Sequence, residues 1–309
     1  MRNDDPVDEM IKAKAILAPM SGVTDVPFRV MARKFGCSFA FTEMIDVNGI
    51  VYGNRKSLKL MEKGPDDSPL GVQIVGEDEN KLVQVARICE EKGFQVVDIN
   101  AGCPARKVIK GGKGAALLKD TVKLARIVRK LVRAVRISVT VKIRSGWDKN
   151  RLNCLEIARA VESEGARAIC VHPRTKAQMY RGRVDHNITR LVKEAVKIPV
   201  FASGDIFSPE DAGEILSLTG ADAVAVARGA LGRPWIFRQI NAYLKGKEAV
   251  SGPSFNELKN LIREHFLLCV EFYGDRRTFP RMYKHLAWYL APFKNLGYIM
   301  NEYTGVRDA

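Results

Sequence analysis

Short apolar segments alternate with amphipathic stretches between Ala15 and Tyr243. The apolar segments predict eight strands, at residues 15–17, 38–42, 70–75, 96–99, 139–143, 168–171, 200–202 and 223–226. The amphipathic stretches carry helix signals, such as Ser208 before Pro209, because Ser favours the N-cap and Pro the first helical position. Strands that alternate with helices indicate a parallel sheet with helical crossovers. Eight units predict an α/β fold of the (β/α)8 TIM-barrel type. A doubly wound sheet is disfavoured, because no Gly-x-Gly-x-x-Gly follows the first strand.

The pattern changes after Tyr243. Residues 245–254 form a polar stretch rich in Gly, Pro and Ser, and from Phe255 onward the apolar positions fall only at helical spacing. A second helix is predicted over residues 279–290. We therefore expect a barrel domain at residues 1–244 and a small all-helical C-terminal domain at residues 250–309.

Composition narrows the class of protein. A chain of 309 residues with 46% hydrophobic residues can form one large barrel and an appendix. No apolar run approaches the ~18 residues of a membrane helix, and the polar, acidic start has no apolar segment for export. The six cysteines are scattered without a Cys-x-x-Cys pair. We therefore expect a cytoplasmic protein without a disulfide framework or a metal site, and a monomer, since no spare apolar face stands out.

The charge points to a polyanionic partner. Lys and Arg number 50 against 35 Asp and Glu, which gives a formal net charge of +15. A solvated surface rich in charged residues is the alternative. Because the excess is basic, we favour a nucleic acid as the partner.

The clearest candidate for chemistry is the turn that follows the fourth predicted strand, Asp98-Ile99-Asn100-Ala101-Gly102-Cys103-Pro104. Gly102 and Pro104 end regular structure, so Cys103 lies on a turn at the carboxyl end of the strand. A thiol there is either reactive or a small buried side chain under the turn. The local sequence does not decide between the two.

Polar or unusual residues stand at nearly every strand end. In a barrel these ends share one face, where active sites lie. Lys142 alternates with Val141 and Ile143, which places Lys142 on the inner side of its strand. It is costly to bury unpaired and should meet an anion or an electron-rich ring; an outward-facing Lys is the alternative. His172, at the end of the sixth strand, is either catalytic or structural.

The loops after strands seven and eight favour phosphate. Ser203-Gly204-Asp205 and Ala227-Arg228-Gly229 both combine a glycine, which permits close backbone approach, with a position where barrels bind phosphate. Arg228 adds a positive charge. The alternative is that the glycines only make tight turns. Metal binding is poorly supported, since only 4 His are present and none is clustered.

Taken together, these segments resemble the tRNA dihydrouridine synthase family, which uses flavin to reduce a uridine in tRNA. The similar segments are Ala18-Pro19-Met20-Ser21-Gly22-Val23-Thr24-Asp25, Thr42-Glu43-Met44, Gln73-Ile74-Val75-Gly76, Asn100-Ala101-Gly102-Cys103-Pro104, Lys142-Ile143-Arg144-Ser145-Gly146-Trp147, Val171-His172, Arg174-Thr175, Gly204-Asp205-Ile206 and Arg228-Gly229-Ala230-Leu231-Gly232. The C-terminal stretch from Arg281 to Tyr289 is also similar to the helical domain of that family.

The resemblance implies FMN as cofactor, NADPH or NADH as reductant, and tRNA as partner. Ala18, Pro19 and Met20 would then pack beside the flavin ring, and Gln73 would bind its pyrimidine edge. Lys142 would stabilise the reduced flavin. The phosphate would be held by Ser203, Gly204, Asp205, Ala227 and Arg228. The substrate uracil would be oriented by Asn100, Lys142 and His172, with Arg174 near the RNA and Arg281 and Lys284 in the tRNA-binding domain.

The implied reaction transfers a hydride from flavin N5 to uracil C6 and a proton from Cys103 to C5, which makes Cys103 a general acid. The chain departs from the family at Ser203, Ala227, Pro173 and Ala101, where Asn, Gly, Gly and Met are frequent. Two other functions stay open. One is a flavin barrel that acts on a small dihydropyrimidine-type substrate, and the other is a tRNA-binding protein without activity.

Overall fold

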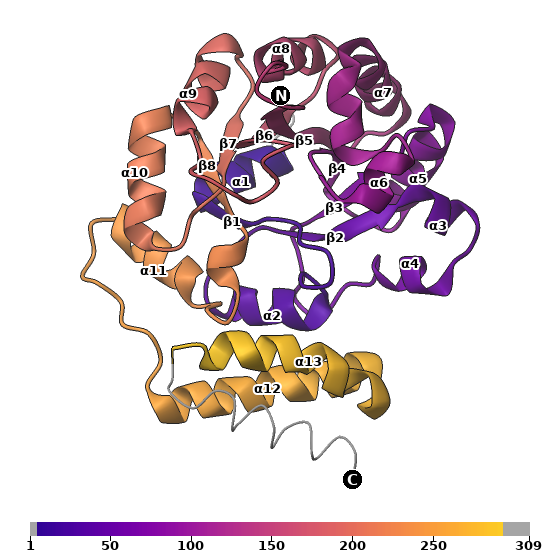
Figure 1. The fold of residues 1–309 in the computed structure, drawn as a ribbon. Helices are drawn as coiled ribbons and strands as arrows, with labels where there is room; N and C mark the ends of the chain where they lie inside the picture. The colour runs from indigo at the N-terminus through magenta and orange to yellow at the C-terminus, as the bar shows by residue number, and fades with distance from the viewer. Residues whose placement is uncertain (1–4, 293–309) are drawn as a thin grey trace.

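Eight parallel strands close into a barrel in the order β1-β2-β3-β4-β5-β6-β7-β8 (Figure 1). The structure is a computed structural model that describes residues 5–292, so residues 293–309 of the predicted C-terminal domain lie outside the described residues. The strands are β1 Ala15–Leu17, β2 Ala40–Asp46, β3 Leu70–Val75, β4 Val96–Ala101, β5 Ser138–Gly146, β6 Ala168–Thr175, β7 Val200–Ser203 and β8 Ala223–Val226. The predicted TIM barrel is confirmed.

Helices surround the barrel in the connections between strands, as Figure 1 shows. The helices of the described residues are α1 Pro6–Ala13, α2 Val26–Lys34, α3 Val47–Val51, α4 Arg55–Lys59, α5 Glu79–Glu91, α6 Arg106–Lys110, α7 Thr121–Ala134, α8 Cys154–Ser163, α9 His186–Ala195, α10 Pro209–Thr219, α11 Ile236–Leu244, α12 Phe255–Tyr273 and α13 Asp275–Leu290, with short 3₁₀ turns η1 Gly114–Lys119 and η2 Arg228–Ala230. Of these, α1 precedes the first strand and α11, α12 and α13 follow the last. Asp25 caps α2, and Ser208, the predicted N-cap, forms a capping box with Asp211 at α10.

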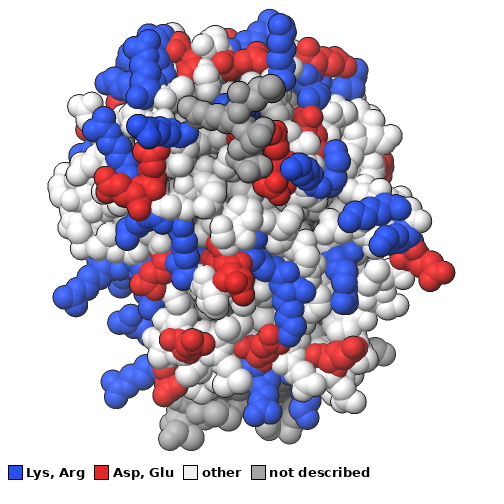
Figure 2. All heavy atoms as spheres, turned by 180° about the vertical axis from the view of Figure 1, so that it is seen from behind, with Lys and Arg blue, Asp and Glu red and all other residues white. Residues whose placement is uncertain are grey.

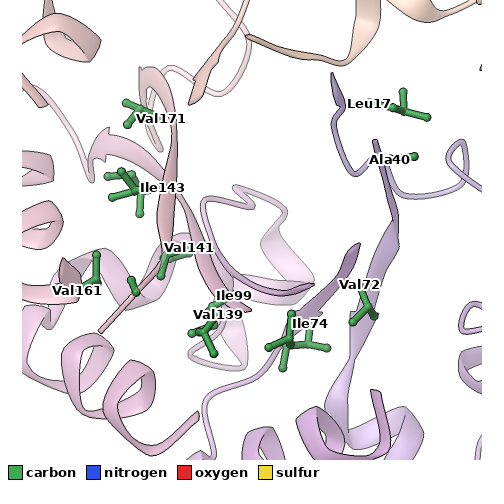
Figure 3. Close-up of a cluster of buried hydrophobic side chains, with 14 of the residues drawn as sticks. Leu17, Ala40, Val72, Ile74, Ile99, Val139, Val141, Ile143, Val161 and Val171 are labelled. Atoms are coloured by element: carbon green, nitrogen blue, oxygen red, sulfur yellow. The ribbon is translucent and has the colours of Figure 1, made fainter. Parts of the chain in front are cut away.

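Alternation along β5 separates the core from the site. Val139, Val141 and Ile143 point outward and pack in the main core with side chains such as Val161 of α8 (Figure 3). Thr140 lies on the opposite side and bonds to Asp98 of β4 inside the barrel. Because successive residues of a strand face opposite sides, the polar residues of β5 point inward.

Helix α1, which the sequence pattern did not predict, closes the barrel at the amino ends of the strands. Asp5 caps the helix by accepting from the Val7 N–H at 3.0 Å. Val7 and Met10 are buried in a second apolar cluster with Ile16, Phe201 and other inward-facing residues. With this end filled, the open end carries the carboxyl ends of the strands.

The helical hairpin of α12 and α13 packs against α2, below the barrel in Figure 1. Met31 of α2 and Trp235 share a buried cluster with Leu258, Leu261 and Tyr289. The backbone of α13 at Trp288 lies so close to Gly232 that no side chain fits between them. Helix α13 begins at Asp275 rather than near 279, and Pro280 lies within it.

The face opposite that of Figure 1 has Lys and Arg interspersed with Asp and Glu (Figure 2). Mixed charges of this kind favour solvation and give no single area of positive potential. In residues 5–292 we find no helix with the length and apolar character that a membrane crossing requires. The same residues contain no group of three or more His, Cys, Asp or Glu suited to a metal ion.

Candidate active site

A cavity of about 540 Å³ opens at the carboxyl ends of the strands. This size suits a cofactor or a drug-sized ligand. Thirteen of the fourteen predicted site residues line it: Ala18, Pro19, Met20, Gln73, Asn100, Cys103, Lys142, His172, Ser203, Gly204, Asp205, Ala227 and Arg228. The barrel therefore brings together residues that are up to 210 positions apart, from Ala18 to Arg228.

Cys103 lies on a turn held by its neighbour Asn100. The side-chain oxygen of Asn100 accepts the backbone N–H of Gly102 at 3.1 Å and that of Cys103 at 2.8 Å. Cys103 is half-buried, and burial raises the pKa of its thiol, although Arg144 opposes the shift. The sulfur therefore keeps its proton at neutral pH, on a residue that lines the cavity.

Lys142 contributes a positive charge to the cavity wall. It stands beside Asn100 in the register of β4 and β5. Within residues 5–292, no hydrogen bond or ion pair engages its ammonium group, although its charge acts on buried Asp98 below. Because burying an unpaired ammonium is unfavourable, the position suits a ligand that carries negative charge.

His172 is a neutral imidazole. Burial and the surrounding cations Lys142, Arg144, Arg174 and Arg228 lower its pKa to about 2. Arg174 donates toward Nε2 of His172 over 3.3 Å, which leaves the ring proton on Nδ1. His172 can therefore donate or accept a hydrogen bond, but it carries no charge at neutral pH.

The two loops predicted to bind phosphate lie against each other. A Cβ on Gly229 would collide with the carbonyl oxygen of Ile206, so only glycine permits this approach. Arg228 donates to Oδ1 of Asp205 at 2.8 Å and stands over the Tyr180 and Phe207 rings, 5.5 and 5.4 Å from their centroids. The loops thus form one tight wall with a cation at its edge.

Arg174 is the one predicted site residue that does not line the cavity. Its guanidinium is 3% exposed and donates to both carboxylate oxygens of Asp205, at 3.0 and 2.5 Å, and to the Gly182 carbonyl at 2.6 Å. Arg174 therefore supports the loop of Asp205 from behind.

Comparison with known proteins identifies the family of this chain. The sequence model for dihydrouridine synthase matches residues 16–304. Similar curated proteins include "tRNA-dihydrouridine synthase B" of Pseudomonas putida, 41% identical over 282 residues that cover 91% of this chain and 83% of that protein. The chain belongs to the dihydrouridine synthase family. The "Probable tRNA-dihydrouridine synthase" of Rickettsia conorii is 40% identical over 305 residues, covering 96% and 92% of the two chains. The resemblance seen in the sequence is confirmed.

The four departures from the pattern of the dihydrouridine synthase family fall in different surroundings. Ser203 and Ala227 line the cavity, whereas Pro173 is buried within β6. Ala101 packs in the outer core, away from the cavity. Only the first two departures can therefore touch a ligand directly.

The first loop that lines the cavity is held from two sides. The N–H of Gly22 donates to the carboxylate of Glu43 in β2, and the ammonium of Lys284 in α13 donates to the Gly22 carbonyl. Glu43 is 6% exposed, and burial raises its pKa. The loop that carries Pro19 and Met20 is therefore fixed by both the barrel and the C-terminal hairpin.

Sequence reasoning missed three residues of the site. Tyr180 and Phe207 stand at the mouth of the cavity, 52% and 42% exposed. Asp98 lies beneath it and is 3% exposed. A signal existed for Asp98, because it interrupts an apolar strand in the same way as Lys142. Exposed aromatic residues on polar loops were the corresponding signal for the other two.

Proposed function

We propose that this chain reduces a uridine of tRNA to 5,6-dihydrouridine, with FMN in the cavity and NADPH or NADH as reductant. One observation carries the proposal: the Cys103 thiol, Asn100, Lys142 and His172 converge on a single cavity in a chain of the dihydrouridine synthase family. Its curated relatives bear the name tRNA-dihydrouridine synthase. We also place the protein in the cytoplasm, where tRNA substrates are available.

The residues of the cavity fit FMN. The volume of about 540 Å³ is suitable. A Cβ on Gly204 would crowd the His172 ring at 3.3 Å, so glycine keeps space open in the loop that we propose holds the phosphate. Lys142 supplies a cation for a ring that gains negative charge on reduction, and Gln73 supplies an amide for the pyrimidine edge. The chemistry that FMN supplies when bound is hydride transfer to C6 of uracil.

The protein supplies the proton. As C6 receives hydride, negative charge develops toward C5, and protonation there completes the reduction of the C5–C6 bond. Cys103 is a thiol at neutral pH because burial raises its pKa. General acid catalysis typically contributes 10²–10⁴-fold to a rate. Asn100 and neutral His172 orient the base, and the uracil leaves its stack to enter the cavity.

The test combines a spectrum with a Cys103→Ala variant. Purified protein should show flavin absorption bands, or acquire them with added FMN; a protein that binds no FMN would remove this function. Cys103→Ala should still bind FMN and oxidise NADPH or NADH, but it should form dihydrouridine at least about 100-fold more slowly. Cys170→Ala, which replaces another buried thiol inside the barrel, is the matched control. An unchanged rate in Cys103→Ala would refute the proton-donor role.

The RNA surface is proposed at a second cleft, of about 950 Å³, between the barrel and the C-terminal hairpin. Helix α4 contributes Arg55 and Lys56 to it, and α13 contributes Arg276 and Arg277. All four side chains are exposed. Cations that line a cleft beside the active site are suited to track phosphates.

Arg281 and Lys284 have other partners. Arg281 lies 3.6 Å from Asp25 and over the Tyr273 ring, and Lys284 is engaged by Gly22. The test of RNA binding therefore uses Arg276→Gln and Arg277→Gln together. The double variant should bind tRNA more weakly and lower the salt slope by about 2, roughly one for each phosphate that the protein no longer neutralises. Lys259→Gln, an exposed change on α12, is the control, and equal slopes would place the RNA elsewhere.

A small-molecule flavoenzyme is the competing function. The basic cleft favours tRNA, because a free pyrimidine requires no extended cationic surface. Dihydrouridine in tRNA after incubation, with no reduction of free uracil or uridine under the same conditions, distinguishes the two.

A further inference from the structure

A chain of hydrogen bonds joins β3, β4 and β5 beneath the cavity. Nε2 of Gln73 donates to Oδ2 of Asp98 at 2.6 Å, and Nδ2 of Asn100 donates to Oε1 of Gln73 at 2.7 Å. Thr140 donates to the other oxygen of Asp98 at 2.7 Å. Asp98, Gln73 and Asn100 are all buried, so these bonds exclude competition from water.

The direction of the chain is fixed at both ends. An ionised Asp98 only accepts hydrogen bonds, so Gln73 must turn its NH₂ group toward it. At the other end, the backbone N–H groups of Gly102 and Cys103 only donate, so Asn100 must turn its oxygen toward them. The two requirements agree, since Asn100 then presents NH₂ to the oxygen of Gln73.

This direction limits what Asn100 offers to a ligand. Its oxygen already accepts two hydrogen bonds, which is its full capacity. One N–H of its NH₂ group remains. Asn100 therefore acts in the cavity as a donor, and its partner must be an acceptor such as a carbonyl oxygen.

We propose that Asp98 is a positioning residue that, together with the backbone N–H groups of Gly102 and Cys103, fixes the direction of the Gln73–Asn100 hydrogen bonds and so keeps Asn100 a donor to a pyrimidine carbonyl. Uracil carries carbonyl oxygens at C2 and C4, whereas cytosine has an amino group at C4. The pyrimidine ligand rests on the proposed function. The direction of the chain rests on the hydrogen bonds alone, and the test separates the two.

The test reverses the chain with two isosteric substitutions. Asn100→Asp places a carboxylate against the oxygen of Gln73, and Gln73 cannot turn while Asp98 requires its NH₂ group. We expect a melting temperature several degrees below that of the original protein at about pH 8, where the carboxylates are ionised. Adding Asp98→Asn removes that requirement, because an amide at 98 can donate to Gln73 and still accept from Thr140. The melting temperature of the double variant should return most of the way to that of the original protein.

The control is Asn153→Asp, alone and with Asp98→Asn. Asn153 is a part-buried donor at the start of α8 and takes no part in the hydrogen bonds of Asp98, Gln73 and Asn100. The effect of Asn153→Asp should therefore add to that of Asp98→Asn. If the losses in the 98/100 pair are likewise additive, the positioning role of Asp98 is overturned. The rescued double variant should also lose dihydrouridine formation, since its residue 100 only accepts; full activity would overturn the donor assignment. An original protein that makes no dihydrouridine would refute the proposed function and leave the melting result standing.

Discussion

Gly232 gives a direct test of how the C-terminal hairpin is attached. Its φ is +66°, and an added Cβ would collide with the Trp288 carbonyl group and lie 2.7 Å from the Tyr289 nitrogen. Both are backbone atoms of α13, so no rotamer change relieves the contact. Left-handed strain costs about 1–2 kcal/mol, and overpacking adds about 1–3 kcal/mol. Gly232→Ala should therefore destabilise the protein by about 2–5 kcal/mol.

Gly246 provides the matched control. Its φ is +64°, but nothing lies within 4 Å of an added Cβ. Gly246→Ala should therefore cost only the strain, about 1–2 kcal/mol. Because each kcal/mol lowers the melting temperature by roughly 2–4 °C in a large domain, the two variants should differ by several degrees. Gly232→Ala should also be cleaved faster in the linker at residues 245–254 under limited proteolysis. Equal melting temperatures and equal cleavage would refute this docking of α13.

Two further predictions concern the same hairpin. Lys284→Met removes the charged donor to the Gly22 carbonyl, and a hydrogen bond of this kind contributes about 1.5–3 kcal/mol. FMN affinity, measured by fluorescence titration, should therefore fall about tenfold in Lys284→Met and stay unchanged in the control Lys259→Met. Equal affinities in the two variants would show that the loop keeps its position without this bond. Burial lowers the pKa of His265 to about 3 and that of His285 well below its ordinary 6.5. As the pH falls, these two His residues are therefore protonated in the unfolded protein before they are protonated in the folded protein. The free energy of unfolding should be highest above pH 6.5 and should decrease from pH 6.5 toward pH 3, by up to about 1.4 kcal/mol per pH unit for each His. Chemical denaturation from about pH 7.5 to about pH 5 measures this slope; His265→Phe should reduce it, and an unchanged slope would contradict the assignment.

Hydrophobic alternation predicted the barrel but ended several strands too early. β2 continues to Asp46 and β6 to Thr175, in each case four residues past the predicted end. The prediction stopped at these points because polar side chains began there. Inside a barrel, however, the upper strand positions face the ligand site, so polar residues there are compatible with a strand. The residues that the prediction left out of these strands are therefore at the end of the barrel where the site lies.

The beginning of α13 was misplaced for a related reason. Pro280 reads as a first-turn residue, yet the helix starts at Asp275 and passes through the proline. Contacts between residues far apart in the sequence could not be predicted from the local sequence pattern. Neither the contact of Lys284 with Gly22 nor the bond of Gln73 to Asp98 has a signature in sequence spacing, because each depends on strand register and on how the hairpin packs.

The position of Lys284 changes the role of the C-terminal helices. The positive charges of α13 predicted an RNA-binding surface, and exposed Arg276 and Arg277 fit that role. Lys284 instead fixes the loop of Met20 at one side of the cavity. The α13 backbone packs on Gly232, which follows the Arg228 loop at the other side. One helix thus supports two loops of the site while it presents cations to the neighbouring cleft. A displacement of α13 by RNA would therefore be transmitted to the cavity through packed backbone rather than through a flexible linker.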